Sequence, residues 1–371
     1  MTSEVQAAIG DLVEGRPLDP ERLARALGEI MDGQSTDART AAFLVALRLR
    51  GETVPQLIAA ARTLRARAIT ATPRDPRTVD TCGTGGSGLD TFNISTTAAF
   101  VVAGAGVSVA KHGNRAASSR SGSFDVLEAL GVQIDLPIET CARILDEVGI
   151  AAFFARTAHP AFRHVAVVRA ELGVRTFLNL LGPLLSPVGA RYQVVGVFEP
   201  ALVERLAAVL AGLGTARALV VHGDDGLDEL TTTAANDAAL VNIGQIERIR
   251  IDARDYGLPR AKLAELRGGS PAENAATTRA ILAGEPGPRR DIVLLNAAAA
   301  LFVVEAVGTL GEGLVRAAQS IDSGAATARL EALREATAST AGATTGNAPD
   351  NSIASRESRA AAGPRARAGR A

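Results

Sequence analysis

The sequence predicts an α/β protein in which a small N-terminal helical domain packs on a larger domain with a central, mostly parallel sheet. Residues 1–72 contain capped segments of helical period, and from Val79 onward short β-rich runs alternate with helical ones, as a parallel sheet requires. The length of 371 residues exceeds the ~100–200 of one domain. We expect a helical domain at 1–72, joined in space by a helical segment near 172–190, an α/β domain at 73–335 and a tail at 336–371.

The helical domain is predicted from residues that start and stop helices. Asp19 stands at an N-cap position, Pro20 at the first helical position and Gly33 at a stop, with apolar residues on one face between them. Residues 36–51 repeat this pattern, and residues 53–68 form a third predicted helix. The domain is therefore expected to be a small bundle of amphipathic helices.

The larger domain is predicted from the alternation that follows. Its predicted strands are TVDTC, VSVAKH, YQVVGV, ALVVHG and IERIRID, beginning at Thr78, Val107, Tyr192, Ala218 and Ile246. The predicted helices between them cover residues 95–106, 123–131, 139–149, 200–214 and 270–284. Because ligands of such sheets gather at the carboxyl ends of the strands, the loops GTGG, KHGNR and GDDGLDE are the most informative segments.

The composition of the chain argues against several functional classes. The net charge is −1, from 39 basic and 40 acidic residues, so no global field attracts nucleic acid or an anionic membrane. Cys82 and Cys141 form no CxxC pair, the N-terminus does not look like a secretory signal, and no apolar stretch reaches ~20 residues. We expect a cytoplasmic protein without nucleic-acid or membrane partners. Residues 336–371, which have almost no large apolar side chain, are expected to form a disordered basic tail.

The loop after the first strand has the pattern of a polyphosphate site. Glycines without Cβ allow a sharp turn that brings several backbone N–H groups against one anion, and they stand at Gly83, Gly85, Gly86 and Gly88. We expect Ser95 or Thr96 to cap the following helix, whose N-terminus adds positive charge. A lone glycine loop fits helix packing about equally well. Lys111 and Lys262 are the only lysines of the chain. A lysine near this loop indicates a compact positive charge that can bind phosphate. Two lysines could also remain through chance drift.

Several blocks, taken in order, resemble one family. These are GTGG, TFNIST, KHGNRAASS, HPAFRHVAVVRAELGVRT, NLLGPL and HGDDGLDELTT, and together the resemblance reaches about residue 335. They resemble the anthranilate phosphoribosyltransferase family, which transfers the phosphoribosyl group of phosphoribosyl pyrophosphate (PRPP) to the amine of anthranilate in tryptophan biosynthesis. The resemblance implies a homodimer that uses Mg²⁺ and binds both substrates in the cleft between the two domains.

The resemblance also implies which residues bind. For PRPP they are Gly83, Thr84, Gly85, Gly86, Ser87, Thr91, Asn93, Ile94, Ser95, Thr96, Lys111, His112, Gly113, Asn114, Arg115, Ala116, Ala117, Ser118, Ser119 and Ser123. For anthranilate they are Gly83, Asn114 and Arg169, the last because a planar guanidinium can hold a carboxylate bidentately. For Mg²⁺ they are Ser95, Asp228 and Glu229, with Asp224 and Asp225 as competing ligands.

Other side chains near these blocks have different expected roles. Arg163 and Arg175 are expected to be structural, and the His112 ring either bonds substrate or is satisfied by backbone. No acid, base or nucleophile is assigned, because an aryl amine is already largely unprotonated at neutral pH and no GxSxG or triad pattern occurs. The chain departs from the family at Ser87, where Asp is usual, and at Ser186, where Asn is usual.

Two other functions are possible for a sequence of this pattern. A pyrimidine-nucleoside phosphorylase shares this architecture, but its own phosphate and base signatures are absent from the sequence. A non-catalytic relative that binds nucleic acid would be expected to lose the acidic pair and gain a basic surface. Asp228, Glu229 and the balanced charge argue against that second alternative.

Overall fold

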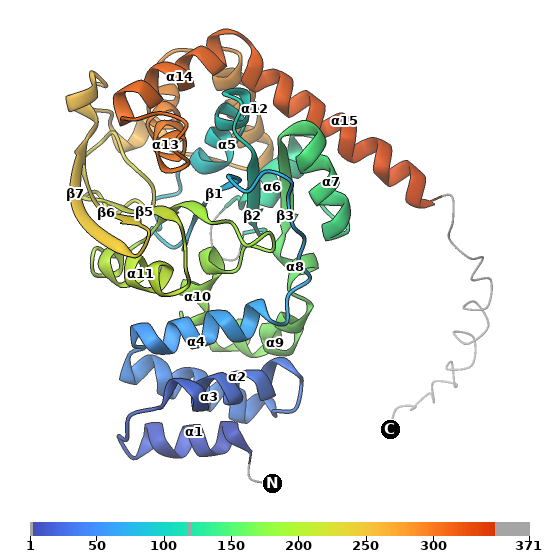
Figure 1. Ribbon diagram of the computed structural model, residues 1–371, viewed down its shortest axis with the longest axis vertical. Coiled ribbons are helices and arrows are strands. Elements are labelled where there is room, and N and C mark those ends of the chain that lie inside the picture. Colours follow the sequence, from blue (N-terminus) through green and yellow to red (C-terminus); the bar gives the residue numbers. More distant parts are fainter. Residues whose placement is uncertain (1–2, 117–119, 346–371) are drawn as a thin grey trace, which may run out of the picture.

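The helical domain forms the lower lobe in Figure 1. The computed structural model describes residues 3–116 and 120–345, with side chains as far as residue 340. The first four helices are α1 (Glu4–Val13), α2 (Pro20–Met31), α3 (Asp37–Arg50) and α4 (Val54–Arg65). Helices α2, α3 and α4 start where the sequence predicts, whereas α1 was not predicted individually.

Local hydrogen bonds explain why these helices begin where they do. The Asp19 carboxylate accepts the backbone N–H groups of Glu21 and Arg22 at 3.0 and 3.1 Å. Thr53 and Gln56 form a reciprocal capping box at the start of α4. Each cap satisfies backbone donors that would otherwise be unpaired at a helix N-terminus.

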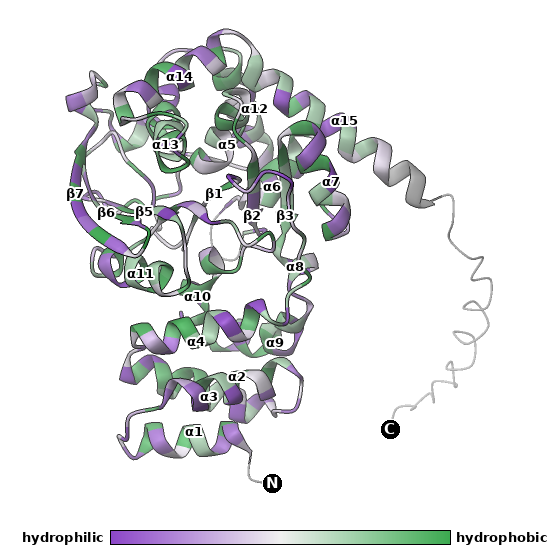
Figure 2. Ribbon diagram, viewed as in Figure 1, coloured by the Kyte–Doolittle hydropathy of each residue, from purple (hydrophilic) through white to green (hydrophobic). Residues whose placement is uncertain are grey.

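A later segment of the chain completes the core of this lobe. Helices α9 (Arg163–Leu172) and α10 (Leu178–Leu181) contribute buried apolar side chains to the same cluster as α1 to α4. The Phe177 ring meets the Phe43 ring edge-on, with centroids 6.3 Å apart. Figure 2 shows hydrophobic and hydrophilic residues alternating along these helices. The connector between α9 and α10 is therefore anchored in the helical lobe.

The α/β lobe is built on one seven-stranded sheet with the order β3-β2-β1-β4-β5-β6-β7. Its strands are β1 (Val79–Gly83), β2 (Val109–Gly113), β3 (Ile150–Phe154), β4 (Tyr192–Gly196), β5 (Arg217–Gly223), β6 (Ala235–Asn242) and β7 (Gln245–Asp252). In the order of the sheet, β3, β2, β1, β4 and β5 are parallel to one another. Strands β6 and β7 follow β5 at one edge and are antiparallel to their neighbours. The predicted fold class is confirmed, although β3 and β6 were not predicted.

Helices cover the faces of this sheet. They are α5 (Ile94–Gly104), α6 (Ser123–Ala129), α7 (Ile138–Val148), α8 (Ala155–Ala158), α11 (Ala201–Gly212), α12 (Pro271–Leu282), α13 (Pro288–Val303), α14 (Leu310–Asp322) and α15 (Ala325–Thr345). Among the helices of the described part of the chain, none is long and apolar enough to cross a membrane.

Two expectations about helix ends were wrong. Helix α5 begins at Ile94 with Asn93 at the N-cap, and no side chain caps it. Ser95 and Thr96 lie inside the helix, and the Asn93 amide bonds Ser121 and Asn274 of α12 in place of the helix N–H groups. The expected tail boundary at 336 was also wrong, because α15 continues to Thr345 and buries Thr337, whose hydroxyl accepts the backbone N–H of Gln133 at 3.1 Å. Residues 346–371 of the expected tail lie outside the described residues.

Candidate active site

The loops that follow β1, β2 and β5 meet at the carboxyl edge of the sheet, where the sequence places them. Gly83 at the end of β1 is paired with Gly196 at the end of β4. A Cβ atom on Gly83 would lie 2.9 Å from Asp228 Oδ2, and one on Gly196 would overlap the Asp228 carbonyl oxygen. The acidic loop after β5 can rest on these two strand ends because neither residue has a side chain.

The glycine-rich loop needs its glycines for backbone conformation. Gly85, Gly86 and Gly88 have φ angles of 67°, 92° and 70°, in the left-handed region that favours glycine. The loop leads into the N-terminus of α5, where the Ile94 N–H bonds the Phe92 carbonyl oxygen at 2.8 Å and the Ser95 N–H bonds Glu229 at 3.0 Å. The glycine loop and the positive end of the helix dipole thus adjoin, an arrangement suited to an anion.

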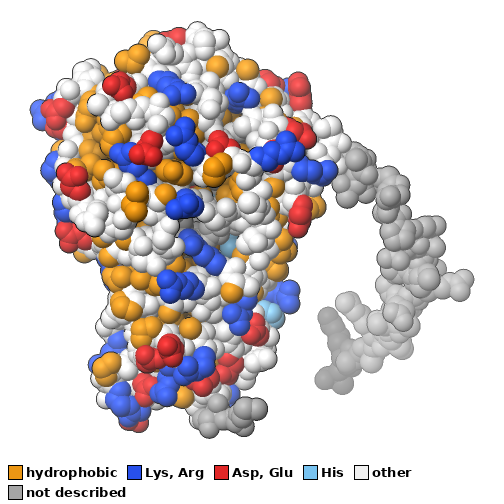
Figure 3. Space-filling model, in the orientation of Figure 1, with side chains coloured by type: hydrophobic (Ala, Val, Ile, Leu, Met, Phe, Trp, Pro, Cys, Tyr) orange, Lys and Arg blue, Asp and Glu red, His pale blue; other side chains and the backbone are white. Residues whose placement is uncertain are grey.

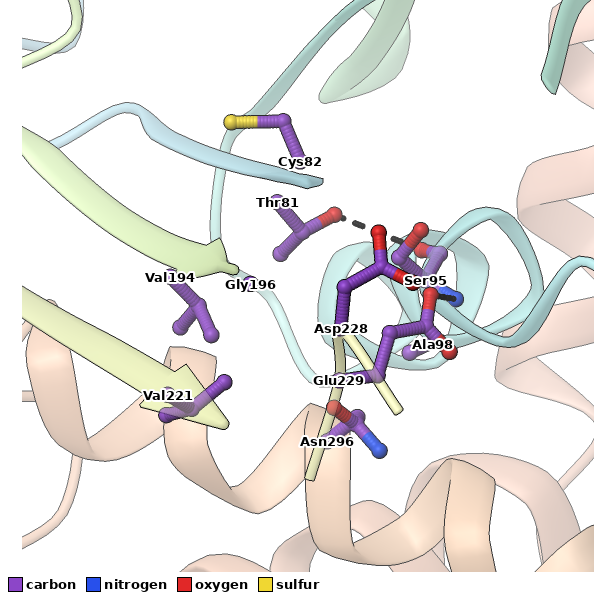
Figure 4. Close-up of a pocket in the computed structure, with 10 residues that line it drawn as sticks. All are labelled: Thr81, Cys82, Ser95, Ala98, Val194, Gly196, Val221, Asp228, Glu229 and Asn296. Carbon is purple, nitrogen blue, oxygen red and sulfur yellow. Dashed lines mark hydrogen bonds between the residues drawn. The ribbon is translucent and has the colours of Figure 1, made fainter. Parts of the chain in front are cut away.

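Asp228 and Glu229 lie against the first turn of α5. Glu229 Oε1 accepts the backbone N–H of Ser95 at 3.0 Å, and Figure 4 shows both carboxylates beside Ser95. Burial, and after it the charge of Asp228, raises the pKa of Glu229 to about 8. Burial also raises the pKa of Asp228, while the Ser87 hydroxyl and the Gly85 backbone oppose that shift by hydrogen bonding. Two crowded carboxyl groups are therefore held in a site of low polarity.

The acidic pair fits a divalent cation. Glu229 Oε2 is buried, with no hydrogen-bond partner among the described residues, and a cation would relieve the repulsion between the two carboxylates. No group of three or more His, Cys, Asp and Glu in the described part of the chain could hold a metal by itself. Mg²⁺ commonly binds through one or two carboxylates together with substrate oxygens and water, so a two-acid site suits it.

The competing acids of the same loop have other partners. The Asp224 carboxylate accepts a bond from Arg250 at 3.0 Å on the surface. Asp225 accepts the backbone N–H of Leu227 at 3.1 Å and the Thr231 hydroxyl at 2.8 Å. These bonds shape the loop and leave Asp228 and Glu229 as the pair that faces α5.

Lys111 is buried in the middle of β2, and its ammonium group donates to the Thr81 carbonyl oxygen. Burial raises the pKa of the adjacent Asp80 to about 6, with the charge of Lys111 as the main opposing effect. The same lysine also lowers the pKa of Glu229. Lys111 therefore supplies positive charge to the interior beneath the glycine loop.

The His112 ring is buried in the interior of the protein. It meets the ring of His159 edge-on, with centroids 5.3 Å apart, and burial lowers the pKa of His112 to about 3. The His159 ring nitrogen Nε2 lies 2.9 Å from the Leu185 carbonyl oxygen. Both imidazoles are therefore neutral at pH 7. The backbone of His112 is satisfied by Asp80, which accepts its N–H at 3.2 Å.

The described residues of the loop between β2 and α6 are held by local hydrogen bonds. The Asp125 carboxylate accepts the backbone N–H groups of Ala116 and Gly122, both at 2.8 Å. The Ser123 hydroxyl donates to the Asn114 carbonyl oxygen at 3.3 Å. Arg115 is exposed and paired with Glu128 at 2.8 Å, so its charge is already neutralised locally. Ala117, Ser118 and Ser119 lie outside the described residues.

Sequence reasoning missed Asn274, which connects three segments of the site. Its amide donates to Asn93 Oδ1 at 2.9 Å, and the same oxygen accepts the Ser121 hydroxyl at 3.2 Å. Asn274 is buried on α12, which was predicted only as a helix. An amide on the inner face of an amphipathic helix was the one signal that could have identified it.

The two arginines near α9 have different surroundings. Arg169 is partly buried, and burial lowers its pKa; no described side chain pairs with its guanidinium. Arg175, expected to be structural, reaches the glycine loop and donates to the Gly86 carbonyl oxygen at 2.5 Å. Figure 3 shows Lys and Arg side chains (blue) along the waist between the lower lobe and the α/β lobe. This basic waist suits anionic ligands.

Comparison with known protein families accounts for both lobes. Residues 6–68 match the family described as "Glycosyl transferase family, helical bundle domain", and residues 75–327 match "Glycosyl transferase family, a/b domain". The fold and the site therefore define a glycosyl transferase with a helical-bundle domain and an α/β domain.

Individual relatives narrow this class. The chain is 54% identical to anthranilate phosphoribosyltransferase of Moorella thermoacetica, covering 89% of this chain and 97% of the relative. It is 52% identical to that of Symbiobacterium thermophilum, covering 90% and 98%. The crystal structure of the Thermus thermophilus enzyme matches with a TM-score of 0.84 at 43% identity, covering 89% and 99%. The chain belongs to the anthranilate phosphoribosyltransferase family.

A more distant relative is known with ligands. The anthranilate phosphoribosyltransferase of Saccharomyces cerevisiae, in complex with PRPP and Mg, matches with a TM-score of 0.85 at 26% identity. The match covers 91% of this chain and 99% of that chain. The relative's ligands are a polyphosphate ester and a divalent cation.

Proposed function

We propose that this protein transfers the phosphoribosyl group of PRPP to the amine of anthranilate, giving N-(5-phosphoribosyl)anthranilate and pyrophosphate in tryptophan biosynthesis. The observation that carries the proposal is the meeting of the glycine loop, the α5 N-terminus and the Asp228–Glu229 pair at one sheet edge. The membership of the family supports the same reaction.

The glycine loop and the acidic pair would receive the leaving group. As the C1–oxygen bond of PRPP breaks, negative charge grows on pyrophosphate, and loop amides together with Lys111 would stabilise it. Asp228, Glu229 and Ser95 would hold Mg²⁺, which neutralises further charge on the polyphosphate when bound. The loop between β2 and α6, including Asn114 and Ser123, would contact the remaining phosphoribosyl group.

Anthranilate would enter from the side of the helical lobe. Arg169 would bind its carboxylate, since the guanidinium is partly buried and unpaired among the described residues. Asn114 and Gly83 would help to orient the amine toward the ribose C1 carbon. The amine needs no dedicated base to become a nucleophile, and His112 is better suited to packing than to proton transfer because its imidazole is held neutral.

The domain organisation is proposed from the two family matches, of which the first ends at residue 68 and the second begins at residue 75, in agreement with a boundary near residue 73. Residues of the segment 172–190 share a buried cluster with α1 to α4, and this cluster continues onto α11 and one face of the sheet. The homodimer rests on the family resemblance, and the cytoplasmic location rests on composition and on the tryptophan-biosynthesis role.

The test is a fluorescence assay of anthranilate consumption with purified protein. Consumption should require both PRPP and Mg²⁺, and pyrophosphate should appear in equal amount. Omitting either component is the control. Folded protein that consumes no anthranilate under these conditions would overturn the proposal.

A further inference from the structure

Arg175 connects the two lobes at the glycine loop. Arg175 lies in the connector between α9 and α10. Phe177 and Leu178, two and three residues further on, are buried in the core of the helical lobe. The Arg175 guanidinium donates to the Gly86 carbonyl oxygen at 2.5 Å and lies 4.3 Å from the centre of the Phe198 ring. The Arg175 side chain is therefore held by a hydrogen bond to Gly86 and by a cation–π contact with the Phe198 ring.

The contact point on the loop is its most constrained residue. Gly86 has a φ of 92°, and a Cβ atom there would overlap the Arg175 guanidinium. The neighbouring Gly85 and Gly88 have open space around them and also have positive φ. The Asp228 carboxylate also holds this part of the loop, through hydrogen bonds from Ser87 and the Gly85 backbone. Glycine-rich segments lose much conformational freedom when they become ordered, so each such contact matters.

The charge of Arg175 is available to the site. None of the ion pairs formed by described residues includes it, and its charge lowers the pKa of Asp228. Arg169 lies six residues earlier, at the end of α9, on the same structural unit. Arg169 thus stands on α9, and the connector that follows α9 places Arg175 on the glycine loop.

We propose that Arg175 is a positioning residue that holds the glycine loop ready for pyrophosphate by tying it to the connector between α9 and α10. The inference deepens the proposed function and rests on it. Without Arg175, PRPP itself has to order more of the loop, so PRPP affinity should fall more than turnover or anthranilate affinity.

The test compares Arg175→Met with Arg163→Met, a control on the exposed start of α9. Arg175→Met should raise the KM for PRPP about tenfold, as expected for loss of one charged hydrogen bond, with KM for anthranilate changed by less than about twofold. Arg175→Lys, which keeps the charge without the planar fork, should fall between wild type and Arg175→Met. The control should behave as wild type.

Hydrogen exchange separates this inference from the proposed reaction. Amides of residues 84–90 should exchange faster in Arg175→Met than in wild type and Arg163→Met, whether or not the protein consumes anthranilate. An inactive wild type would overturn the function, while unchanged loop exchange would overturn the role of Arg175. Equal increases in KM for both substrates, or wild-type kinetics in Arg175→Met, would also overturn it. If Arg175→Met fails to fold, Arg175→Lys decides by the same two measurements.

Discussion

The helical lobe and the carboxyl edge of the sheet are built by different kinds of interaction. In the helical lobe, caps such as Asp19 and Thr53 bond residues two or three positions away. At the sheet edge, Ser95 bonds Glu229 and Arg175 bonds Gly86, across 134 and 89 positions. The helix starts of the first region are thus fixed by neighbours in sequence, whereas the sheet edge is fixed by packing of distant segments. Changes at the sheet edge should therefore alter activity, while changes at caps should alter stability.

The largest expected effect is at the acidic pair. Replacing Asp228 by Asn and Glu229 by Gln together should lower turnover by orders of magnitude and raise the Mg²⁺ concentration required, because leaving-group charge is poorly neutralised. Stability without substrate should stay equal or increase, since burial disfavours the charged form of both carboxyl groups and the neutral amides avoid that cost. Turnover across a Mg²⁺ titration and the urea midpoint measure both effects. An unchanged titration curve would show that the acids do not bind metal.

Arg169→Ala should weaken anthranilate about ten- to a hundredfold, the effect of losing a charged hydrogen bond of ~1.5–3 kcal/mol. PRPP binding should remain nearly intact, because only anthranilate loses its carboxylate partner. KM values for both substrates, compared with those of Arg163→Ala, measure the difference. Equal losses for both substrates would contradict the assignment.

The stability of the fold should also depend on pH, through a buried histidine. Burial lowers the pKa of His159 from its ordinary 6.5 to about 4, so the neutral ring stabilises the fold above pH 6.5 and that stabilisation is lost as pH falls through 4. Between pH 7.5 and 5 the loss should be about 2 kcal/mol for His159. Urea unfolding of wild type and His159→Gln at both pH values measures it. The same pH dependence in both proteins would mean that His159 is not responsible.

Ser87→Asp tests the loop where the chain departs from its family. Ser87 stands beside Asp228, so a new carboxylate would add negative charge to the proposed metal site. The enzyme should remain active and reach its optimum at lower Mg²⁺, with kcat/KM changed within about tenfold, or ~1.4 kcal/mol. The change is expected to be small because the proposed mechanism assigns most of the leaving-group charge to the loop amides and Lys111. Complete inactivity of the folded variant would indicate a different loop organisation.

The smallest effect is expected in the helical lobe. Asp19→Ala removes the cap of α2 and should cost about 1 kcal/mol in the free energy of unfolding. Because the cap lies in the other lobe, kcat and both KM values should match those of wild type. On the same preparation, urea unfolding measures the free energy of unfolding and steady-state kinetics measure kcat and both KM values. A loss of activity without a loss of stability would break the contrast between the two regions.

Much of the fold was predictable because its signals are local. Helices α2, α3 and α4 carry their caps in sequence, and strands β1, β2, β4, β5 and β7 were predicted from β-rich runs. Strand β3, IAAFF, is a short apolar run directly after a helix, and the Ala-rich β6 has weak β-propensity, so neither was recognised. Helices α13 to α15 were not predicted individually, and the true end of α15 depends on the docking of Thr337.

The sequence by itself determined which loops form the candidate site, because the carboxyl ends of parallel strands share one edge and the glycines and acids follow those strands. Only the tertiary structure decided which side chains meet there. It paired Asp224 with Arg250, assigned the Asn93 amide to Asn274, and brought Arg175 onto Gly86. The physical reason is that a side-chain contact depends on the approach of segments far apart in the chain, and no local pattern records that approach.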